Sequence, residues 1–188
     1  EDLHESMGYN RLWAFYREKG VSLEIQDFRG LVAHETTSRK SVLRNQSTGI
    51  VVDLGRQSLF ADWSREKIDR MRVTNYATGL MKRHHSEQKH EYMINPSVLE
   101  ADVVLNLAKP KSHRKSGLTA CAKKFVGACM RKEDLPHHTV GSKAEDGDEY
   151  NKKSALHRLQ SRLLDRKNDS EYAGERRFFF YKWLYKFI

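Results

Sequence analysis

The 188-residue sequence contains only two cysteines and three prolines, and its cysteines do not form a Cys-x-x-Cys pair. Cys121 and Cys129 fall on one predicted helix, about 12 Å apart along its axis, which is too far for a disulfide. An iron–sulfur cluster usually requires four thiolates, so we expect no such cluster within this chain. This shortage of cysteine pairs favours a reducing, cytoplasmic setting.

The sequence also shows no signal peptide and no apolar run near the roughly 18 residues that a membrane span requires. We therefore expect no transmembrane segment. The most apolar stretch starts at Phe178, ends at Ile188, contains two lysines and follows Arg176 and Arg177. Such an aromatic and basic end could rest on a membrane surface, but its composition is more typical of a helix that docks on a partner.

Positive charge is unevenly distributed along the chain, whose formal net charge is +9. Residues 109–132 contain eight Lys or Arg and no Asp or Glu. A concentrated excess of this kind indicates an anionic partner more strongly than a diffuse excess does.

Apolar periodicity predicts an alternation of helices and strands. Helices are expected over residues 6–19, 63–71, 96–100, 118–130 and 151–167, and strands over 21–28, 50–55, 92–94 and 103–108. Residues 74–91 lack a clear pattern, and we expect His84, His85 and His90 to be exposed in that loop. The alternation favours the α/β class, with an open, mostly parallel sheet and flanking helices that form part of a larger doubly wound domain.

We expect a single α/β domain over residues 1–167, because the hydrophobic fraction of 38% and the length allow one sizeable core. Residues 168–188 are expected to form a polar break followed by an aromatic and basic terminal helix. Within the domain, Ser64 is a natural N-cap for a helix on which Lys67 is expected to face solvent.

The stretch from residue 103 to residue 130 is predicted to be a strand, a basic loop and a helix. In α/β proteins this order is typical of a site that holds an anion at a helix N-terminus, although the P-loop spacing is missing here. The loop offers cations, hydroxyls and a flexible glycine, the groups that a phosphate or carboxylate site needs. The candidate ligand-binding residues are Lys109, Lys111, Ser112, Arg114, Lys115, Ser116, Gly117, Thr119 and Lys123. The alternative interpretation is a solvated basic loop before an ordinary helix.

Imidazoles occur on both loops that flank this predicted helix. His113, His137 and His138 are the candidate catalytic residues, since histidine can transfer protons near neutral pH. The same residues could bind a metal with nearby carboxylates, but their spacing matches no established metal motif, and the metal is left unassigned. We expect His113 and the His137–His138 pair to converge on one pocket with Asp148 or Glu149 at its rim.

The residues from 106 to 127, together with Leu135-Pro136-His137-His138 and residues 147–150, resemble the domain of unknown function 362 family. That family has a strand ending in Asn, then Pro-x-Lys-x-His, a Gly-x-Thr step, a Lys-rich helix and a later Leu-Pro-His-His. The resemblance covers most of residues 9–165 and implies that the chain is a fragment lacking the amino-terminal and carboxy-terminal parts of the family. Members are sometimes attached to ferredoxin-type iron–sulfur modules. The resemblance favours a ligand site on residues 109–119 but brings no reaction with it.

We therefore expect a domain that binds a small anionic ligand, a phosphate or carboxylate, on residues 109–119. Whether it is also an enzyme that uses His and Lys acid–base chemistry is left open. One alternative is nucleic-acid binding through residues 109–132, although the basic loop over residues 109–117 contains no aromatic residue for stacking and Phe125 is expected to be buried. Another alternative is a redox-partner module of an iron–sulfur protein, although the chain has no cluster ligands of its own.

Overall fold

The computed structural model describes residues 6–28, 31–32, 42–43, 49–73, 76–113 and 115–187. The strands are β1 (Leu31–Val32), β2 (Val42–Leu43), β3 (Ile50–Asp53), β4 (Met71–Arg72), β5 (His85–Ser86), β6 (Lys89–Ile94), β7 (Lys111–His113), β8 (Gly117–Thr119) and β9 (His138–Thr139). The α-helices are α2 (Tyr9–Glu18), α3 (Arg65–Asp69), α4 (Thr78–His84), α5 (Pro96–Glu100), α6 (Cys121–Lys124), α7 (Ala155–Tyr172) and α8 (Arg177–Lys186). Short 3-10 turns are η1 (Gly55–Gln57), η2 (Phe125–Ala128), η3 (Lys132–Asp134) and η4 (Lys143–Glu145).

The strands form small antiparallel pairings and one three-stranded sheet of order β3-β6-β5. Every pair of named strands is antiparallel, namely β1–β2, β3–β6, β4–β9, β5–β6 and β7–β8. The mixture of helices and strands confirms the α/β content that the sequence predicts. The expectation of an open, mostly parallel sheet is wrong for the described residues, because every named pair runs antiparallel, both between neighbours such as β5 and β6 and between distant segments such as β4 and β9.

Several local predictions are confirmed where the capping chemistry is strong. Ser64 accepts a hydrogen bond from Lys67 N at the start of α3. Asn95 caps α5 in the same way, and Pro96 occupies the first helical position, where its missing N–H costs nothing. Strands β3 and β6 and helices α2 and α7 also lie where the periodicity predicts them.

The predicted strands over residues 21–28 and 103–108 are not formed, and both segments are extended chain without ladder partners in the described structure. The second segment is strongly apolar, yet Leu107 is 87% exposed. In the part of the chain that the structure describes, Asn106 joins this segment to α6 by two hydrogen bonds. Its Nδ2 donates to Cys121 O at 2.8 Å, and the Cys121 thiol donates to Asn106 O at 3.6 Å. An apolar run becomes a buried strand only where a sheet edge lies beside it, and the described residues provide no such edge here.

The predicted helix over residues 118–130 is much shorter in the structure. Residues 117–119 form strand β8, α6 begins at Cys121 and ends at Lys124, and the tighter turn η2 follows. Conversely, the region 74–91, which is predicted to be irregular, contains α4, β5 and the start of β6. The polar break predicted from residue 168 is limited to a turn, because α7 continues to Tyr172.

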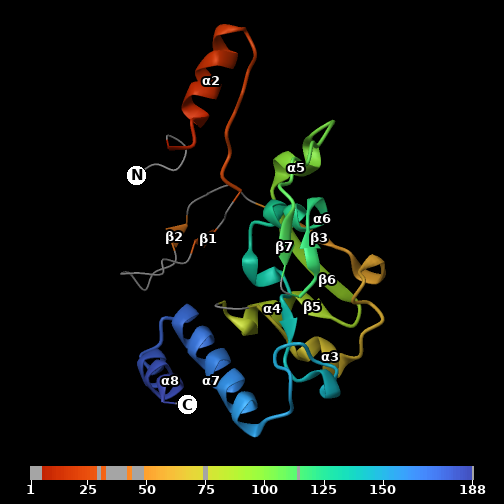
Figure 1. The fold of residues 1–188 in the computed structure, drawn as a ribbon, viewed down its shortest axis with the longest axis vertical. Coiled ribbons are helices and arrows are strands. Elements are labelled where there is room, and N and C mark those ends of the chain that lie inside the picture. The colour runs from red at the N-terminus through yellow and green to blue at the C-terminus, as the bar shows by residue number, and fades with distance from the viewer. Residues whose placement is uncertain are drawn as a thin grey trace.

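A buried apolar cluster joins α3, β4 and α4. It comprises Ile68, Met71, Val73 and Met81, with Phe60, Trp63 and Tyr76 packed against it. Helix α7 packs against α4 and pairs along its length with α8 (Figure 1). The aromatic edge of this cluster forms one wall of the candidate site described below.

Polar contacts attach α7 to this core. Arg72 Nε donates to Asp165 Oδ2 at 2.8 Å, and Thr78 Oγ1 donates to Asp165 Oδ1 at 2.9 Å. One turn further on, Asp169 Oδ1 accepts from Gly79 N at 3.0 Å. The two carboxylates of α7 therefore hold β4 and the start of α4 in place.

Within the part of the chain that the structure describes, no helix combines the length and the apolar character needed to cross a lipid bilayer.

Candidate functional site

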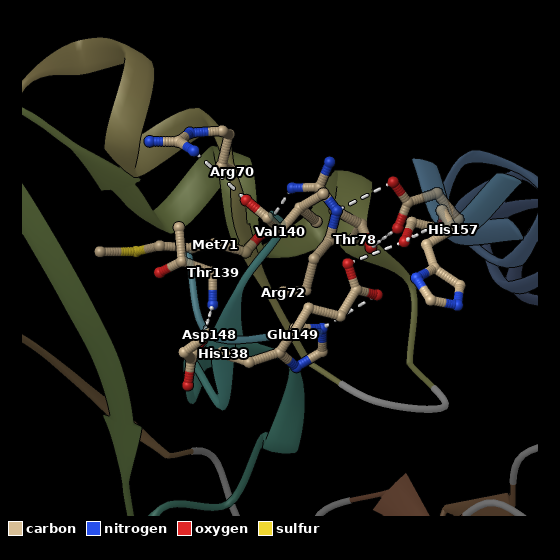
Figure 2. A network of polar contacts seen from close by, with 12 residues as sticks. Arg70, Met71, Arg72, Thr78, His138, Thr139, Val140, Asp148, Glu149 and His157 are labelled. Atoms are coloured by element: carbon tan, nitrogen blue, oxygen red, sulfur yellow. Dashed lines mark hydrogen bonds and ion pairs between the residues drawn. The ribbon is translucent and has the colours of Figure 1, made fainter. Parts of the chain in front are cut away.

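The loop that carries His137 and His138 runs antiparallel to β4 (Figure 2). His137 N donates to Arg72 O at 2.8 Å, and the β4–β9 register places His138 opposite Arg72. Val140 N then donates to Arg70 O at 2.9 Å. These backbone bonds fix the two imidazoles beside the apolar cluster.

A cavity of about 410 Å³ lies between this loop and α3. Its apolar wall consists of Phe60, Trp63, Met71 and Pro136. Its polar lining consists of Lys67, His137, His138, Thr139, Lys143, Asp146 and Asp148, with Gly147 between the acids. We call it the His137–His138 cavity. An apolar wall that faces a few convergent polar groups is the usual construction of a small-molecule site.

Lys67 brings a positive charge to this wall. Its Nζ lies 4.2 Å from the centre of the Trp63 ring, a cation–π distance, and 2.7 Å from Asp146 Oδ2. Asp146 is largely exposed, so water screens the ion pair and its net strength is small. The ammonium group is therefore held only weakly by Asp146.

Asp148 connects the cavity to the basic hairpin of β7 and β8. Its Oδ1 accepts from Thr139 N at 2.6 Å, and its Oδ2 accepts from Lys115 Nζ at 2.8 Å. Lys115 Nζ also donates to the backbone oxygen of Asp148 at 2.9 Å. Desolvation raises the pKa of Asp148, but the bonds from Lys115 and Thr139 outweigh it, so the net pKa is lowered and the carboxylate stays charged.

His138 faces a carboxylate on the other side of the same loop. Its Nε2 lies 3.7 Å from Glu149 Oε1, and Ser161 Oγ of α7 donates to Glu149 Oε2 at 2.7 Å (Figure 2). Desolvation raises the pKa of Glu149, and the contacts with His138 and Ser161 together lower it below its ordinary value. Glu149 is therefore an ionised partner that orients His138.

His137 is exposed over much of its surface, but protein atoms around its ring remove part of its hydration. This desolvation lowers the pKa of His137, and the nearby charges of His138, Lys123 and Lys132 lower it further. A lowered pKa favours the neutral imidazole at neutral pH, which is the form that can accept a proton.

The far side of the loop is held by a compact set of bonds around Glu145. Ser142 and Glu145 form a reciprocal capping box at the start of η4, and Arg158 of α7 makes an ion pair with Glu145. The glycines permit this turn: a Cβ on Gly147 would lie 2.6 Å from the Cα of Gly141, whose own φ is 122°. The cavity rim is thus shaped by backbone that tolerates no larger residue at position 147.

His113 lies outside the cavity lining. Its Nδ1 accepts from Lys115 N at 3.3 Å and from Ser116 N at 3.2 Å, so its ring closes the turn of the β7–β8 hairpin. Of the residues expected to converge on one pocket, His137, His138 and Asp148 line the cavity. His113 does not line it, but its ring accepts from the backbone N–H of Lys115, whose side chain reaches Asp148.

Most of the remaining candidate residues form the β7–β8 hairpin, not a loop at a helix N-terminus, whereas Lys109 precedes β7 and Lys123 lies on α6. Lys111 pairs with Thr119 and Ser112 with Leu118 across the two strands. Lys109, Lys111, Ser112, Ser116, Gly117 and Lys123 are exposed, and Arg114 lies outside the described residues. With only four residues, α6 is too short to present the N-terminal anion site that the sequence predicts.

Sequence reasoning missed the aromatic and cationic wall. Lys67 was expected to face solvent, but it lines the cavity with Phe60 and Trp63. Trp63 and Lys67 are spaced i and i+4 at the start of a predicted helix, and this spacing is the signal that could have indicated a shared face.

The expectation that His85 and His90 are exposed is also wrong, because they are 3% and 0% exposed. Their Nδ1 atoms lie 3.2 Å apart, and His85 Nε2 lies 2.8 Å from Asp134 O. The ring of His90 also lies 5.9 Å from that of Phe60, centre to centre, so this pair supports the cavity wall from behind.

Among the described residues, no group of three or more His, Cys, Asp or Glu side chains is arranged to hold a metal ion. Both cysteines are free thiols, with Cys121 exposed and Cys129 buried. Burial raises the pKa of the Cys129 thiol to about 11, which keeps it protonated and unreactive as a nucleophile.

Of the comparisons with known proteins, the one with family models gives a match. No curated protein and no solved structure matches the chain. A family model described as "Domain of unknown function (DUF362)" matches residues 34–170, which is well over half of the chain and includes the whole His137–His138 cavity. The chain therefore belongs to the DUF362 family.

Proposed function

We propose that the chain binds a small anionic molecule with a planar or apolar part in the His137–His138 cavity. The observation that supports this proposal is the position of Lys67, whose ammonium group lies against Trp63 inside a cavity of ligand size. The aromatic wall would take the apolar part of the ligand, and Lys67 would hold its phosphate or carboxylate.

The basic hairpin supports the same ligand class from outside the cavity. Lys115 reaches its rim through Asp148, and the charges of Lys123 and Lys132 act on His137. Cations on this side raise the local concentration of an anion and steer it toward the opening. Lys109 and Lys111 are exposed on the hairpin, and we assign them this steering role rather than direct contact.

Proton transfer is the chemistry for which the cavity is equipped. His137 is biased toward the neutral form, which can accept a proton, and ionised Glu149 orients the neighbouring His138 ring. Binding and proton transfer are separate parts of the proposal, and binding is tested first. We place this activity in the cytoplasm, where free Cys121 would stay reduced.

Calorimetric titration with three probes tests the binding proposal. Phenyl phosphate carries both parts of the expected ligand, whereas inorganic phosphate and phenol carry one each. We expect phenyl phosphate to bind most tightly, and Lys67→Met to weaken it about tenfold, the loss of one charge-assisted contact of about 1.4 kcal/mol. Lys82→Met removes an exposed lysine of α4 that does not line the cavity, and it should leave the affinity unchanged.

Equal binding of phenyl phosphate by the wild-type chain and by Lys67→Met would contradict the cavity as the anion site. Tight binding of inorganic phosphate, unaffected by Lys67→Met but weakened by Lys111→Met, would move the site to the hairpin instead.

A second candidate function is favoured by one observation. Phe125 is 53% exposed beside Lys123 and Lys124, whereas the sequence predicts that it is buried. An exposed aromatic ring among lysines can stack a base of single-stranded nucleic acid while the cations contact its backbone. Oligonucleotides of increasing length, added to the same titration, separate the two functions: affinity that grows with length, with a salt dependence that steepens in parallel, indicates nucleic acid.

A further inference from the structure

The last helix carries an aromatic stripe on its outer face. Phe180, Trp183 and Phe187 follow one another at i, i+3 and i+7, so they lie on one side of α8. They are 58%, 54% and 72% exposed, and the rings of Trp183 and Phe187 are 4.8 Å apart, centre to centre. Three large exposed rings on one side of a helix are costly in water unless another surface covers them.

The opposite side of α8 is already used. Phe178 is buried, and α8 packs along α7, which separates it from α4 and the strands (Figure 1). The stripe therefore points away from the body of the described chain and cannot be covered by α7.

The helix that carries this stripe is rich in cations, although the Lys182 ammonium group lies on the other side, 5.5 Å from the centre of the buried Phe178 ring. Arg176, Arg177, Lys182 and Lys186 are all exposed, and residues 176–187 contain no Asp or Glu. No ion pair joins any of these four cations to an acid of the described residues. The surface that covers the stripe should therefore be apolar at its centre and negatively charged around it.

We propose that α8 binds the surface of a membrane that contains anionic lipids. The helix lies parallel to the surface, its aromatic stripe enters the boundary between headgroups and acyl chains, and its cations contact the anionic headgroups. Trp and Tyr favour this boundary because one part of the ring system is apolar and another can form a hydrogen bond. With 10 residues, α8 is about half the length of a membrane span, so it lies on the bilayer without crossing it.

Vesicle co-sedimentation of the full chain tests this proposal. Vesicles of phosphatidylcholine mixed with phosphatidylserine should bind the chain, and vesicles of phosphatidylcholine should bind it much more weakly. The double variant Trp183→Ala, Phe187→Ala should lose about tenfold or more in binding, because two large rings no longer leave water. The double variant Lys182→Gln, Lys186→Gln should lose about fivefold per cation and should respond less to added salt.

Trp13→Ala combined with Phe15→Ala is the matched control, since it removes two exposed aromatic rings from α2, and binding should stay at the wild-type level. Far-ultraviolet circular dichroism shows whether each variant is folded. The lysine variant keeps the whole apolar stripe, so the proposal can still be tested if the aromatic variant unfolds.

Equal binding to neutral and anionic vesicles would overturn the proposal, as would wild-type binding by both α8 variants. Sedimentation velocity provides a further test: dimers of the wild-type chain that disappear in Trp183→Ala, Phe187→Ala, together with no vesicle binding, would identify the stripe as a contact between two copies. Neither result would affect the cavity proposal, because no residue of the stripe lines the His137–His138 cavity.

Discussion

At the scale of single residues, the His85–His90 contact excludes protonation of both imidazoles at once, because one of the two Nδ1 atoms must be a bare acceptor. A backbone carbonyl only accepts, so Asp134 O receives the hydrogen of His85 Nε2, and His85 Nδ1 must then accept from His90 Nδ1. His90 Nε2 is left as a bare acceptor without a partner among the described residues. A proton added to His85 would either place two N–H groups against each other at 3.2 Å or move the His90 hydrogen to Nε2, which is buried and has no acceptor among the described residues.

The charged groups around His85 and His90 do not make protonation of the pair favourable. Desolvation lowers the pKa of both histidines; the contact with Asp134 acts against it at His85, and Asp53 acts against it at His90. Asp53 accepts from the backbone N–H of His90, not from its ring, and the neighbouring His84 is already paired with Glu91. The net effect at both histidines is a pKa below 6.5 in the folded chain.

We therefore predict that the free energy of unfolding falls as the pH falls below about 6.5. Between the lowered folded pKa and 6.5 the unfolded chain binds more protons, so the stability contributed by the neutral pair is complete above 6.5 and is lost on acidification. Each histidine contributes at most about 1.4 kcal/mol per pH unit to this slope. Urea unfolding at several pH values measures it.

His90→Gln supplies the comparison, because the Gln amide can donate to His85 but does not titrate. We expect its stability to depend less steeply on pH between 7 and 5 than that of the wild-type chain. A variant as acid-sensitive as the wild type would show that other groups govern the acid response.

At the scale of elements, α7 holds together the two segments that form the cavity. Asp165 binds β4 through Arg72 and α4 through Thr78, while Ser161 and Arg158 bind the loop after β9. Helix packing alone would let β4 and the loop after β9 shift relative to α7, so these hydrogen bonds set the spacing of the cavity walls.

Asp165→Ala should therefore lower the free energy of unfolding by about 2 kcal/mol, because it leaves the partly buried Arg72 without its carboxylate. Asp165→Ala should also weaken phenyl phosphate binding, since Arg72 lies on β4 and β4 pairs with the strand β9 that contains His138. Arg65→Ala breaks the exposed Arg65–Asp69 pair of α3 and should cost no more than about 0.5 kcal/mol. Equal losses in the two variants would contradict the role given to α7.

Elements of this chain could be predicted where the deciding interactions are local. The start of α3 follows from Ser64, the start of α5 from Asn95 and Pro96, and the end of α2 from Gly20, whose φ of 71° suits glycine. Such interactions involve residues at most a few positions apart, so they are visible in the sequence.

Other elements depend on distant partners and could not be predicted. Residues 103–108 have the composition of a buried strand, but no sheet edge of the described residues lies beside them. His90 is buried because Phe60 and Tyr92 lie near the same imidazole pair. For the candidate site, the family-like residues His137 and His138 were identified, whereas Lys67 required knowledge of which helix faces that loop.

At the scale of the whole molecule, the positive charge and the apolar surface are divided between separate regions. The hairpin of β7 and β8 carries cations near the cavity rim, whereas α8 carries cations and aromatic rings on the far side of α7. This separation allows a ligand and a membrane to bind at the same time, and it makes their effects on the chain distinguishable.

Ligand binding should stabilise the whole folded chain, because only the folded chain contains the cavity. At a free phenyl phosphate concentration of about 100 times Kd, the expected gain is about 2.7 kcal/mol. For a chain of this length, that gain raises Tm by roughly 5–10 °C. Lys67→Met should lose about half of this shift at the same concentration, because tenfold weaker binding leaves a gain of about 1.4 kcal/mol. Trp183→Ala combined with Phe187→Ala should keep the whole shift, because α8 takes no part in the cavity. Differential scanning fluorimetry measures both variants side by side. A shift that disappears in the α8 variant but persists in Lys67→Met would reverse the assignment and place the ligand on the terminal helix.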